Sequence, residues 1–454
     1  MDNLYEKRLG NAPMRSLVFK MAMPAIAAQL VNLLYNIVDR IYIGHIPNIG
    51  THALAGVGLT AAVVILIASF AAIVGAGGAP LAAIALGQGD RHKAGKIMGN
   101  GTVLLLLFGI FLILLTSIFQ QPLLTLSGAS PETLPYAMDY LKVYLYGTFF
   151  VLLTTGLNAF INAQGQPAVA MTSVIIGAAI NLGLDPIFIF GLDLGVKGAA
   201  WATVISEACS ALWVIRFLTS SKASLRLSLP QMRLESKIVG SIIGLGLSPF
   251  VMASTESLIC FVLNGTLSQY GDIYVSALAI MQSALLLAGT PLVGFAQGFV
   301  PIASYNFGHG NMQRVKSCFR IALTFMFTFN FLFIMAMILL PETTAALFTD
   351  DPALIATVGR HMPLFLAGMT IFGLQRACQN MFVALGQAKI SIFIAFLRKI
   401  ILLIPLVMLL PRYLDVNGVF AAEAIADATA ALCCTLLFAY YFPRIIRKNV
   451  RATA

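Results

Sequence analysis

Two polar side chains interrupt an otherwise apolar stretch of the sequence. Residues 177–190 read GAAINLGLDPIFIF, and Asn181 and Asp185 stand four residues apart within it. On a helix this spacing places both side chains on one face, a single turn apart. Because ionised groups inside a membrane are costly, such residues are candidates for a functional site.

A second polar stripe runs along the first long apolar segment. Gln29, Asn32, Asn36 and Asp39 follow one another at intervals of three, four and three residues, and Tyr35 lies beside them. These intervals put the polar groups on one helix face. That face must meet protein or water, because hydrocarbon chains offer no hydrogen-bond partners.

Three polar residues fall at one depth if the apolar segments span a membrane. Asp39 and Asp185 each precede the outer end of a segment by about five residues, and Thr203 follows the start of another by about five. Oxygen ligands suit a hard cation such as Na+, and repelling carboxylates in a poorly solvated place also take up protons. We predict a cation or proton site at Asp39, Asn181, Asp185 and Thr203. The alternative is that Asn181 bonds a neighbouring backbone group and Asp185 caps the turn at Pro186.

The composition indicates an integral membrane protein. Hydrophobic residues make up 59% and charged residues 10% of the 454 positions, whereas a soluble domain carries about 25% charged residues. The net charge of +10 does not indicate nucleic acid, because the Lys and Arg residues lie between apolar runs. The six cysteines form no C-x-x-C pair, so neither a disulfide framework nor a zinc site is predicted.

Spanning helices need about 20 apolar residues, and the chain divides into twelve such segments. They are residues 15–44, 54–86, 96–120, 136–162, 168–190, 199–219, 238–266, 273–306, 318–340, 361–384, 390–410 and 418–442. The polar N-terminus lacks a small-residue cleavage pattern, so the first span is expected to remain in the mature protein.

The distribution of charge predicts the orientation. One set of loops and termini is basic, with Lys7, Arg8, Arg15, Arg91, Lys93, Lys96, Lys222, Arg226, Arg233, Lys237, Arg314, Lys316, Arg444, Arg447, Lys448 and Arg451. The other set holds mainly acids, namely Glu132, Asp272, Glu342, Asp350 and Asp351. By the positive-inside rule the basic side is cytoplasmic. We expect a multi-pass protein of a bacterial or archaeal cytoplasmic membrane with both termini in the cytoplasm.

The sequence also repeats itself. PLAAIALGQGDRHK (80–93) matches PIASYNFGHGNMQR (301–314) at a shift of 221 residues, and NAQGQP (162–167) matches VALGQA (383–388) at the same shift. Six crossings restore the chain direction, so the halves are parallel repeats, as in transporters. We predict an N-lobe at 1–219, a cytoplasmic linker at 220–237 and a C-lobe at 238–454. A duplicated scaffold without a transport role is the alternative.

The order of several motifs resembles the multidrug and toxic compound extrusion (MATE) transporters over essentially the whole chain. The motifs are NLLYNIVDRIYIG in the first span, the GQGDRHK and GHGNMQR loops, NAQGQP, NLGLDPIFIF, GVKGAAWAT and LSPFVMASTES. The resemblance implies an all-α membrane fold of twelve helices in two pseudo-symmetric six-helix lobes, of the MATE/MOP type.

The DinF-like branch of this family implies roles for particular residues. Its N-lobe cation site corresponds to Asp39, Asn181, Asp185 and Thr203, the residues that the depth argument brings together. A proline at which the first helix bends corresponds to Pro24. We expect the substrate cavity to be lined by Tyr35, Asn36, Asn158, Glu256 and Gln282.

The chain departs from the NorM-like branch of the family. That branch has a C-lobe cation site built from a Glu in the seventh span and an Asp in the tenth. Glu256 fits the first, but the tenth span has no acid and carries Arg376. Glu256 is expected to bind cationic substrate or a second proton, or to pair with Arg376. Arg398 and Lys399 are expected to snorkel or to line the cavity, whereas Glu207, Glu423 and Asp427 receive no role.

The function that these observations predict is antiport. We expect a monomer that uses H+ and/or Na+ to export amphipathic, often cationic drugs and toxic organic compounds, and so to confer antibiotic resistance. Its partners would be small-molecule substrates and membrane lipids, and no cofactor is expected beyond the coupling ion. The sequence contains no H-E-x-x-H, G-x-S-x-G or Walker motif, so an enzyme is not predicted. A lipid or lipid-linked oligosaccharide flippase is the closest alternative, and a membrane prenyltransferase lacks its Asp-rich loops here.

Overall fold

The computed structural model describes residues 8–47 and 49–453, which are almost entirely helical. The N-lobe contains α2 (Met14–Gly44), α3 (Gly50–Gly87), α4 (Arg91–Leu126), α5 (Leu134–Ala163), α6 (Pro167–Pro186) with the π-helix η1 (Ile187–Gly191), and α7 (Gly195–Thr219). A linker that includes the short helix η2 (Leu229–Met232) leads to the C-lobe.

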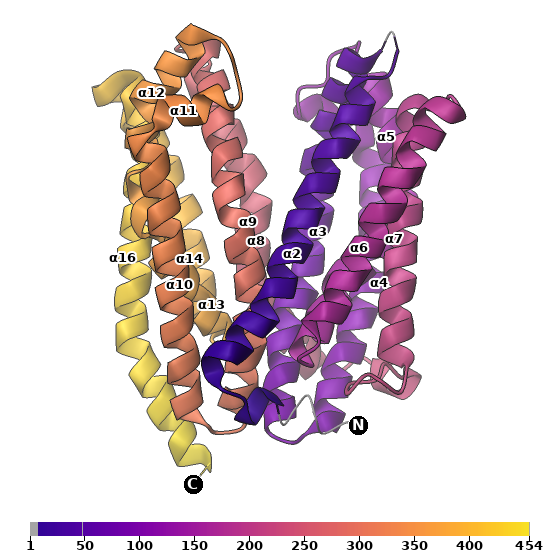
Figure 1. Ribbon diagram of the computed structural model, residues 1–454, viewed down its shortest axis with the longest axis vertical. Helices are drawn as coiled ribbons and strands as arrows, with labels where there is room; N and C mark the ends of the chain where they lie inside the picture. Colours follow the sequence, from indigo (N-terminus) through magenta and orange to yellow (C-terminus); the bar gives the residue numbers. More distant parts are fainter. Residues whose placement is uncertain (1–7, 48, 454) are drawn as a thin grey trace.

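The C-lobe begins with three long helices, continues with shorter ones and ends with a helix of 43 residues that is kinked at Asp415. It contains α8 (Ser236–Leu267), α9 (Asp272–Gly308), α10 (Met312–Leu339), α11 (Pro341–Ala346), α12 (Pro352–Leu366), η3 (Gly368–Ile371), α13 (Phe372–Ala384), α14 (Ala388–Phe396), the π-helix η4 (Leu397–Leu403), α15 (Ile404–Leu409) and α16 (Pro411–Thr453). Figure 1 shows the two lobes as neighbouring bundles.

The described residues include 11 helices long and apolar enough to cross a membrane, or 12 if a bent pair counts as one span. This confirms the predicted number of crossings. The bent pair is α12 with α13, which meet at 46°. The predicted span began at 361, but α12 begins at Pro352, because Asp351 caps it by accepting a hydrogen bond from the Ala353 amide at 2.9 Å.

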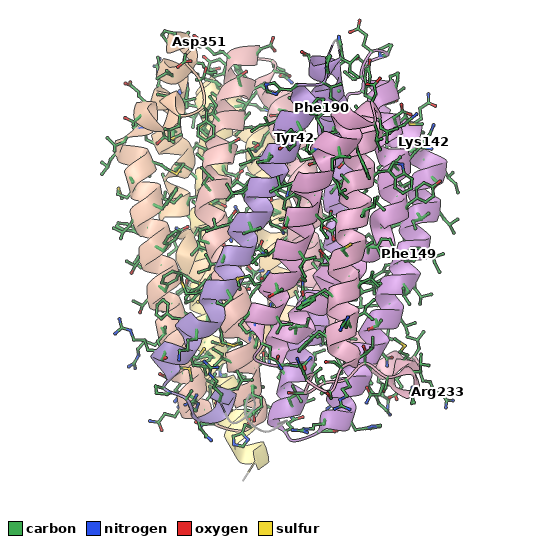
Figure 2. The ribbon with its side chains drawn as sticks, turned by 45° about the vertical axis from the view of Figure 1, so that its right-hand side comes forward. Tyr42, Lys142, Phe149, Phe190, Arg233 and Asp351 are labelled. Carbon is green, nitrogen blue, oxygen red and sulfur yellow. The ribbon has the colours of Figure 1, made fainter. Side chains whose placement is uncertain are left out.

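The repeated motifs form matching turns at one end of the bundle. Gly89 and Gly310 have φ of 80° and 79°, a conformation that L-residues with side chains rarely adopt. The next residue, Asp90 or Asn311, caps the following helix by accepting a backbone hydrogen bond. We call this end, with turns 88–90, 164–166, 309–311 and 385–387 and linker 220–235, the basic end. Figure 2 shows linker residue Arg233 at this end and Asp351 at the other, which we call the acidic end.

The lobes are packed against each other toward the basic end. A Cβ on Gly246 of α8 would lie 2.1 Å from the Ile73 carbonyl oxygen of α3, and one on Gly308 of α9 would lie 2.0 Å from the Ile84 oxygen. These helices can therefore approach closely only because glycine has no side chain. The Arg314 side chain adds hydrogen bonds to backbone oxygens of residues 9 and 12. Toward the acidic end the ribbons of the two lobes diverge (Figure 1).

Candidate functional site

The pair Asn181 and Asp185 lies inside the N-lobe. Both side chains on α6 are buried, and the Asn181 amide donates to an Asp185 carboxylate oxygen at 3.3 Å. One residue later Pro186 ends α6, and the chain continues as the π-helix η1. Pro lacks an amide hydrogen, which explains why the regular ladder is interrupted here, and π segments are frequent at functional sites. The alternative interpretation had Asn181 bonding a backbone group and Asp185 capping the turn at Pro186. In the structure the two side chains bond each other.

Other helices bring further polar groups to this pair. Asp39 on α2 interacts electrostatically with Asp185. The Tyr140 hydroxyl on α5 lies next to Thr203 of α7 and interacts with both carboxylates. Helix α2 and the three successive helices α5, α6 and α7 therefore meet here, and the four predicted residues belong to one cluster. We call Asp39, Tyr140, Asn181, Asp185 and Thr203 the N-lobe cluster.

An aromatic contact lies beside this cluster toward the acidic end. The rings of Tyr42 on α2 and Phe190 on η1 meet edge to face with centroids 6.4 Å apart. Figure 2 shows both residues near the acidic end. The contact joins α2, which carries Asp39, to η1, which directly follows the helix that carries Asp185.

Three oxygens of the N-lobe cluster lack hydrogen-bond partners. They are Asp39 Oδ1, Asn181 Oδ1 and Asp185 Oδ2, and all three are buried. Buried polar atoms are normally satisfied, so each exception calls for an explanation. Two carboxylates and an amide oxygen form a donor set that fits Na+, and the carboxylates could instead hold protons. The orphaned oxygens are the observation that makes this cluster a candidate ion site.

Tyr140 was not among the residues predicted from the sequence. A signal was available, because Tyr136, Tyr140 and Tyr144 recur every four residues and so share one face of α5. Tyr140 and Tyr144 stack with centroids 5.9 Å apart. Glu207, which received no role, interacts with Tyr144 and with Tyr35. The cluster therefore continues toward Glu207 along this tyrosine face.

The predicted cavity residues are dispersed. Asn36 donates to the backbone oxygen of Asn32 at 2.7 Å, and Tyr35 interacts with Asp39. Asn158 donates to the Ser173 hydroxyl at 2.8 Å and so joins α5 to α6. Gln282 is half-buried on α9. Their roles in a substrate cavity stay predictions.

Pro24 lies inside α2, where it removes a helical hydrogen bond. It lines a pocket of about 300 Å³ together with the turn between α5 and α6. On another side, α2 is packed tightly: a Cβ on Gly298 of α9 would lie 2.4 Å from the Ala22 Cα atom. A bend at Pro24 thus has free volume available near the α5–α6 turn. Its function as a hinge stays a prediction.

The C-lobe contains a second charged cluster, formed by α8, η4 and α16. Arg398 forms an ion pair with Asp427 and lies 3.7 Å from Glu423. Lys399 binds Glu256 at 2.9 Å. Arg398 and Lys399 are buried at 6% and 3% exposure, so they do not snorkel to the surface. The partner of Glu256 is thus Lys399.

Arg376 has no carboxylate within ion-pairing distance among the described residues. Its guanidinium lies 5.4 Å from the Phe372 ring centroid, and Arg398 covers the same ring at 4.2 Å. The suggested pairing of Glu256 with Arg376 is therefore replaced by the pairing with Lys399. Sequence spacing could not decide between Arg376 and Lys399 as the partner of Glu256, because both cations lie on other helices than Glu256.

We expect Glu256→Gln to destabilise the protein as well as to weaken export of cationic drugs. The Lys399 ammonium would lose its counter-charge while 3% exposed, and an unsatisfied buried group costs about 1–3 kcal/mol. Thermal unfolding should shift down in Glu256→Gln, and Glu256→Gln combined with Lys399→Met should regain most of the loss. Glu132→Gln, at a side chain 78% exposed, is the control. An unchanged unfolding temperature in Glu256→Gln would contradict this coupling.

The chain is similar to known proteins over nearly its whole length. The MatE family model matches residues 24–187 and 250–409. The multidrug export protein MepA of Staphylococcus haemolyticus is 25% identical over 410 residues, which cover 90% of each chain. MepA of Staphylococcus aureus is 25% identical over 426 residues, or 94% of each chain.

Solved structures have the same fold. A crystal structure of MATE in the bent conformation has a TM-score of 0.91 at 21% identity and covers 98% of this chain and 99% of that one. The outward-facing conformation of a multidrug resistance MATE family transporter of the MOP superfamily scores 0.89 at 22% identity, covering 97% and 98%. Because the family model matches more than half of the chain, the chain belongs to the MatE family of membrane transporters.

Proposed function

We propose that the protein is a cation-coupled antiporter that exports amphipathic, often cationic, organic compounds from the cytoplasm. The basic end would face the cytoplasm, as the positive-inside rule predicts. The relatives named as multidrug export proteins support this class of substrate. The proposal for coupling rests on one observation, the three buried oxygens without partners on Asp39, Asn181 and Asp185.

The N-lobe cluster would couple ion entry to export. A proton arriving from outside neutralises either Asp39 or Asp185, or Na+ binds to both, and either event reduces the repulsion between the two carboxylates. The weaker repulsion between these carboxylates on α2 and α6 allows α2 to bend at Pro24. For a neutral substrate, the entry of one positive charge is worth about 2.3 kcal/mol per 100 mV, which supports a roughly 50-fold concentration ratio of that substrate.

A flippase for lipid-linked oligosaccharides is the main competing function. It would need a cavity with net positive charge to hold a pyrophosphate. Near the C-lobe cluster the three cations Arg376, Arg398 and Lys399 stand with three acids, namely Glu256, Glu423 and Asp427. This charge balance favours drug export.

Drug efflux in a host that lacks its own exporters tests the proposed function. Expression of the chain should raise resistance to cationic dyes and lower their accumulation. Resistance unchanged across a panel of cationic, zwitterionic and neutral compounds would contradict multidrug export. Complementation of a flippase-deficient strain would favour the competing function.

We expect protons alone to drive transport, with Na+ competing at the same site. In proteoliposomes with an imposed pH gradient and no Na+, dye transport should proceed. Added Na+ should move its pH dependence to more acidic values, because Na+ stabilises the deprotonated carboxylates. Thr203→Val should weaken the Na+ effect, while Thr172→Val, at an exposed hydroxyl on α6, should not. Absence of transport without Na+ at every pH would rule out proton sufficiency.

A further inference from the structure

Two short segments at the basic end occupy equivalent places in the two repeats. Residues 8–13 lead into α2, and residues 229–235 lead into α8. The shift of 221 residues that relates the repeats places residue 8 on residue 229. Residues 8–11 are helical, as is η2 at Leu229–Met232. We call the two segments the first strap and the second strap, since each continues into the first long helix of a lobe.

The first strap is bound by the C-lobe. The Arg314 guanidinium of α10 donates to the backbone oxygens of Leu9 and Ala12 at 3.1 and 2.9 Å. Its Nε atom donates to the side-chain oxygen of Asn306 on α9 at 2.9 Å, and the Asn306 amide donates to the Leu9 oxygen at 3.1 Å. Hydrogen bonds from a charged donor are stronger than neutral ones. Arg314 and Asn306 therefore bind the strap carbonyls as one unit.

The same strap also packs against the N-lobe. The Leu9 side chain is 1% exposed. A Cβ on Gly165, in the turn between α5 and α6, would lie 3.4 Å from the Leu9 Cγ atom. Leu9 thus connects the lobes, because its side chain lies against the N-lobe while its carbonyl binds the C-lobe. If the lobes separate at the basic end, one of these two contacts must be lost.

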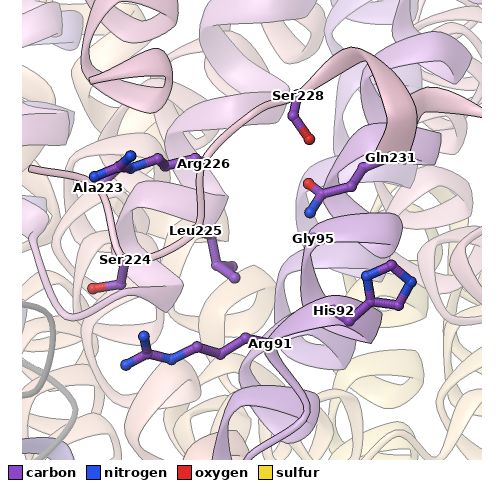
Figure 3. Close-up of a pocket in the computed structure, with 9 residues that line it drawn as sticks. All are labelled: Arg91, His92, Gly95, Ala223, Ser224, Leu225, Arg226, Ser228 and Gln231. Carbon is purple, nitrogen blue, oxygen red and sulfur yellow. The ribbon is translucent and has the colours of Figure 1, made fainter. Parts of the chain in front are cut away.

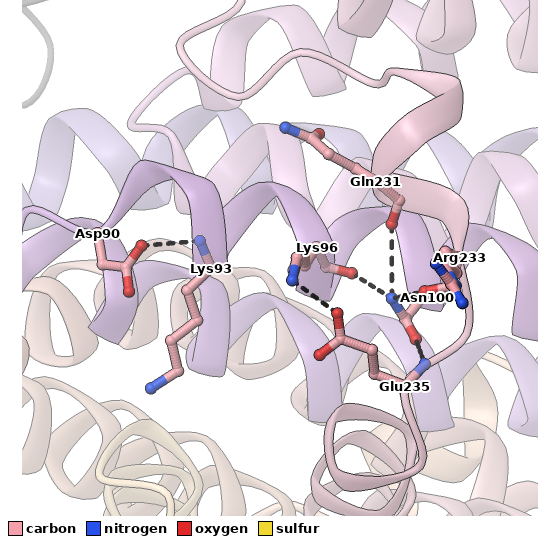
Figure 4. A network of polar contacts seen from close by, with 7 residues as sticks. All are labelled: Asp90, Lys93, Lys96, Asn100, Gln231, Arg233 and Glu235. Atoms are coloured by element: carbon pink, nitrogen blue, oxygen red, sulfur yellow. Dashed lines mark hydrogen bonds and ion pairs between the residues drawn. The ribbon is translucent and has the colours of Figure 1, made fainter.

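The second strap is bound by the N-lobe. The Asn100 amide of α4 donates to the Arg233 carbonyl at 3.0 Å, and the Asn100 oxygen accepts from the Glu235 amide at 2.7 Å (Figure 4). Figure 3 shows the Gln231 side chain extending toward Gly95 of α4, where a Cβ would lie 2.6 Å from the terminal atoms of Gln231. Glycine therefore lets the strap lie directly on α4. Helix α8 begins at residue 236, directly after these contacts.

The two straps are bound by equivalent helices. Helix α4 follows the repeated turn 88–90, and α10 follows its equivalent, the turn 309–311. Each of these helices binds the strap that leads into the first long helix of the other lobe. Separation of the lobes at the basic end would move α10 away from the N-lobe and α4 away from the C-lobe. Both sets of hydrogen bonds therefore lie across the surfaces that must separate.

We propose that the two straps hold the basic end closed, and that the hydrogen bonds of Arg314 and Asn100 must break before it opens. A contact that exists in only one conformation shifts the equilibrium toward that conformation. Arg314 and Asn100 are then positioning residues, which act on transport through the conformational equilibrium. The inference rests on the proposed function in one respect, namely that the basic end opens during transport.

Distances between two spin labels test the first strap in the full-length protein, reconstituted without substrate after its native cysteines have been replaced. The labels are placed at Lys93 and Gln313, exposed positions at the starts of α4 and α10. Arg314→Gln should raise the ratio of long to short distances about tenfold, the factor that one hydrogen bond to a charged group provides. Lys316→Gln, which removes an exposed cation two residues away on α10, is the matched control.

Unchanged distances in Arg314→Gln, or an equal change in Lys316→Gln, would overturn the proposal. Arg314→Lys covers the case in which Arg314→Gln does not fold. It keeps the charge but not the planar fork of donors, so it should shift the distance ratio in the same direction by a smaller factor. Because no substrate is present, failure of this test would leave drug export, measured by dye efflux, as a separate question.

The second strap is tested by Asn100→Ala with the same labels. We expect a shift in the same direction as in Arg314→Gln. The two factors should multiply in the double variant, because the two sets of hydrogen bonds share no residue. Thr102→Val is the control, since this buried hydroxyl on α4 donates to Met98 of its own helix at 2.9 Å. A lower unfolding temperature in Asn100→Ala with unchanged distances would show a purely structural role and overturn the proposal for this strap.

Discussion

The Asp185→Asn variant is expected to lose drug export while remaining folded. The exchanged groups have nearly the same shape, and an amide oxygen at position 185 can still accept the Asn181 hydrogen bond of 3.3 Å. The variant cannot, however, carry the charge that a proton or Na+ neutralises. Without coupling, a membrane potential of 100 mV no longer contributes the roughly 50-fold concentration ratio that one inward charge gives for a neutral substrate. Dye accumulation in whole cells and uptake by proteoliposomes both measure this loss.

Asp193→Asn is the matched control for this prediction. Asp193 lies eight residues further along the chain, is exposed, and has a φ of 53°, a conformation that Asn tolerates well. It should retain parental export. If Asp185→Asn exports dye at the parental rate, the N-lobe cluster is not the coupling site. If Asp185→Asn loses export and is also poorly expressed, its unfolding temperature and monodispersity decide whether misfolding causes the loss.

The Gly246→Val variant is expected to prevent the closure of the basic end. A Cβ at this position would lie 2.1 Å from the Ile73 carbonyl oxygen across the interlobe seam, so α3 and α8 must separate. Overpacking of this kind costs about 1–3 kcal/mol. If the cost falls only on the conformation in which the basic end is closed, the equilibrium between this conformation and the one open at the basic end shifts roughly 5- to 150-fold. Transport requires both conformations, so export should fall accordingly.

Gly244→Val provides a control on the same helix. Gly244 lies two residues away on α8, and a Cβ at this position would meet no heavy atom of a neighbouring segment within 4 Å. The same loss of glycine therefore meets open space. Both variants should reach the membrane in equal amounts, and only Gly246→Val should lose transport.

Cysteine labelling reports the opening of the seam directly. A cysteine at the buried position Ile242, in a chain whose native cysteines have been replaced, should react faster with maleimide in Gly246→Val than in Gly244→Val. Equal labelling and equal export in both variants would contradict a closed seam at this end.

Much of the fold can be predicted from local sequence patterns. The apolar segment lengths predicted twelve crossings, and the structure and the family confirm this architecture. The shift of 221 residues predicted equivalent turns, and Gly89 and Gly310 indeed share one backbone conformation. The boundaries of the lobes at residues 219 and 238 stay a prediction, as does the ion-binding role of the N-lobe cluster.

Some features have no local signature. The shared helix face of Asn181 and Asp185 is not one of them, because the helix period alone determines it. That Tyr140 lies beside Thr203 depends on how α5 packs against α7, and a four-residue tyrosine repeat does not indicate which helix it faces. The tenth span likewise begins earlier than its hydropathy indicates, because an N-cap at Asp351 determines the start.

The sequence by itself determined that the protein spans a membrane twelve times and that its halves are parallel repeats, and it predicted that two carboxylates lie at one depth. Hydropathy and helical spacing are local properties, so they can be read along the chain. Only the tertiary structure decided that Glu256 pairs with Lys399, and that glycines such as Gly246 form the seam between the lobes. Such choices depend on which atoms of distant helices face one another, and packing between helices determines this, whereas spacing within one helix does not.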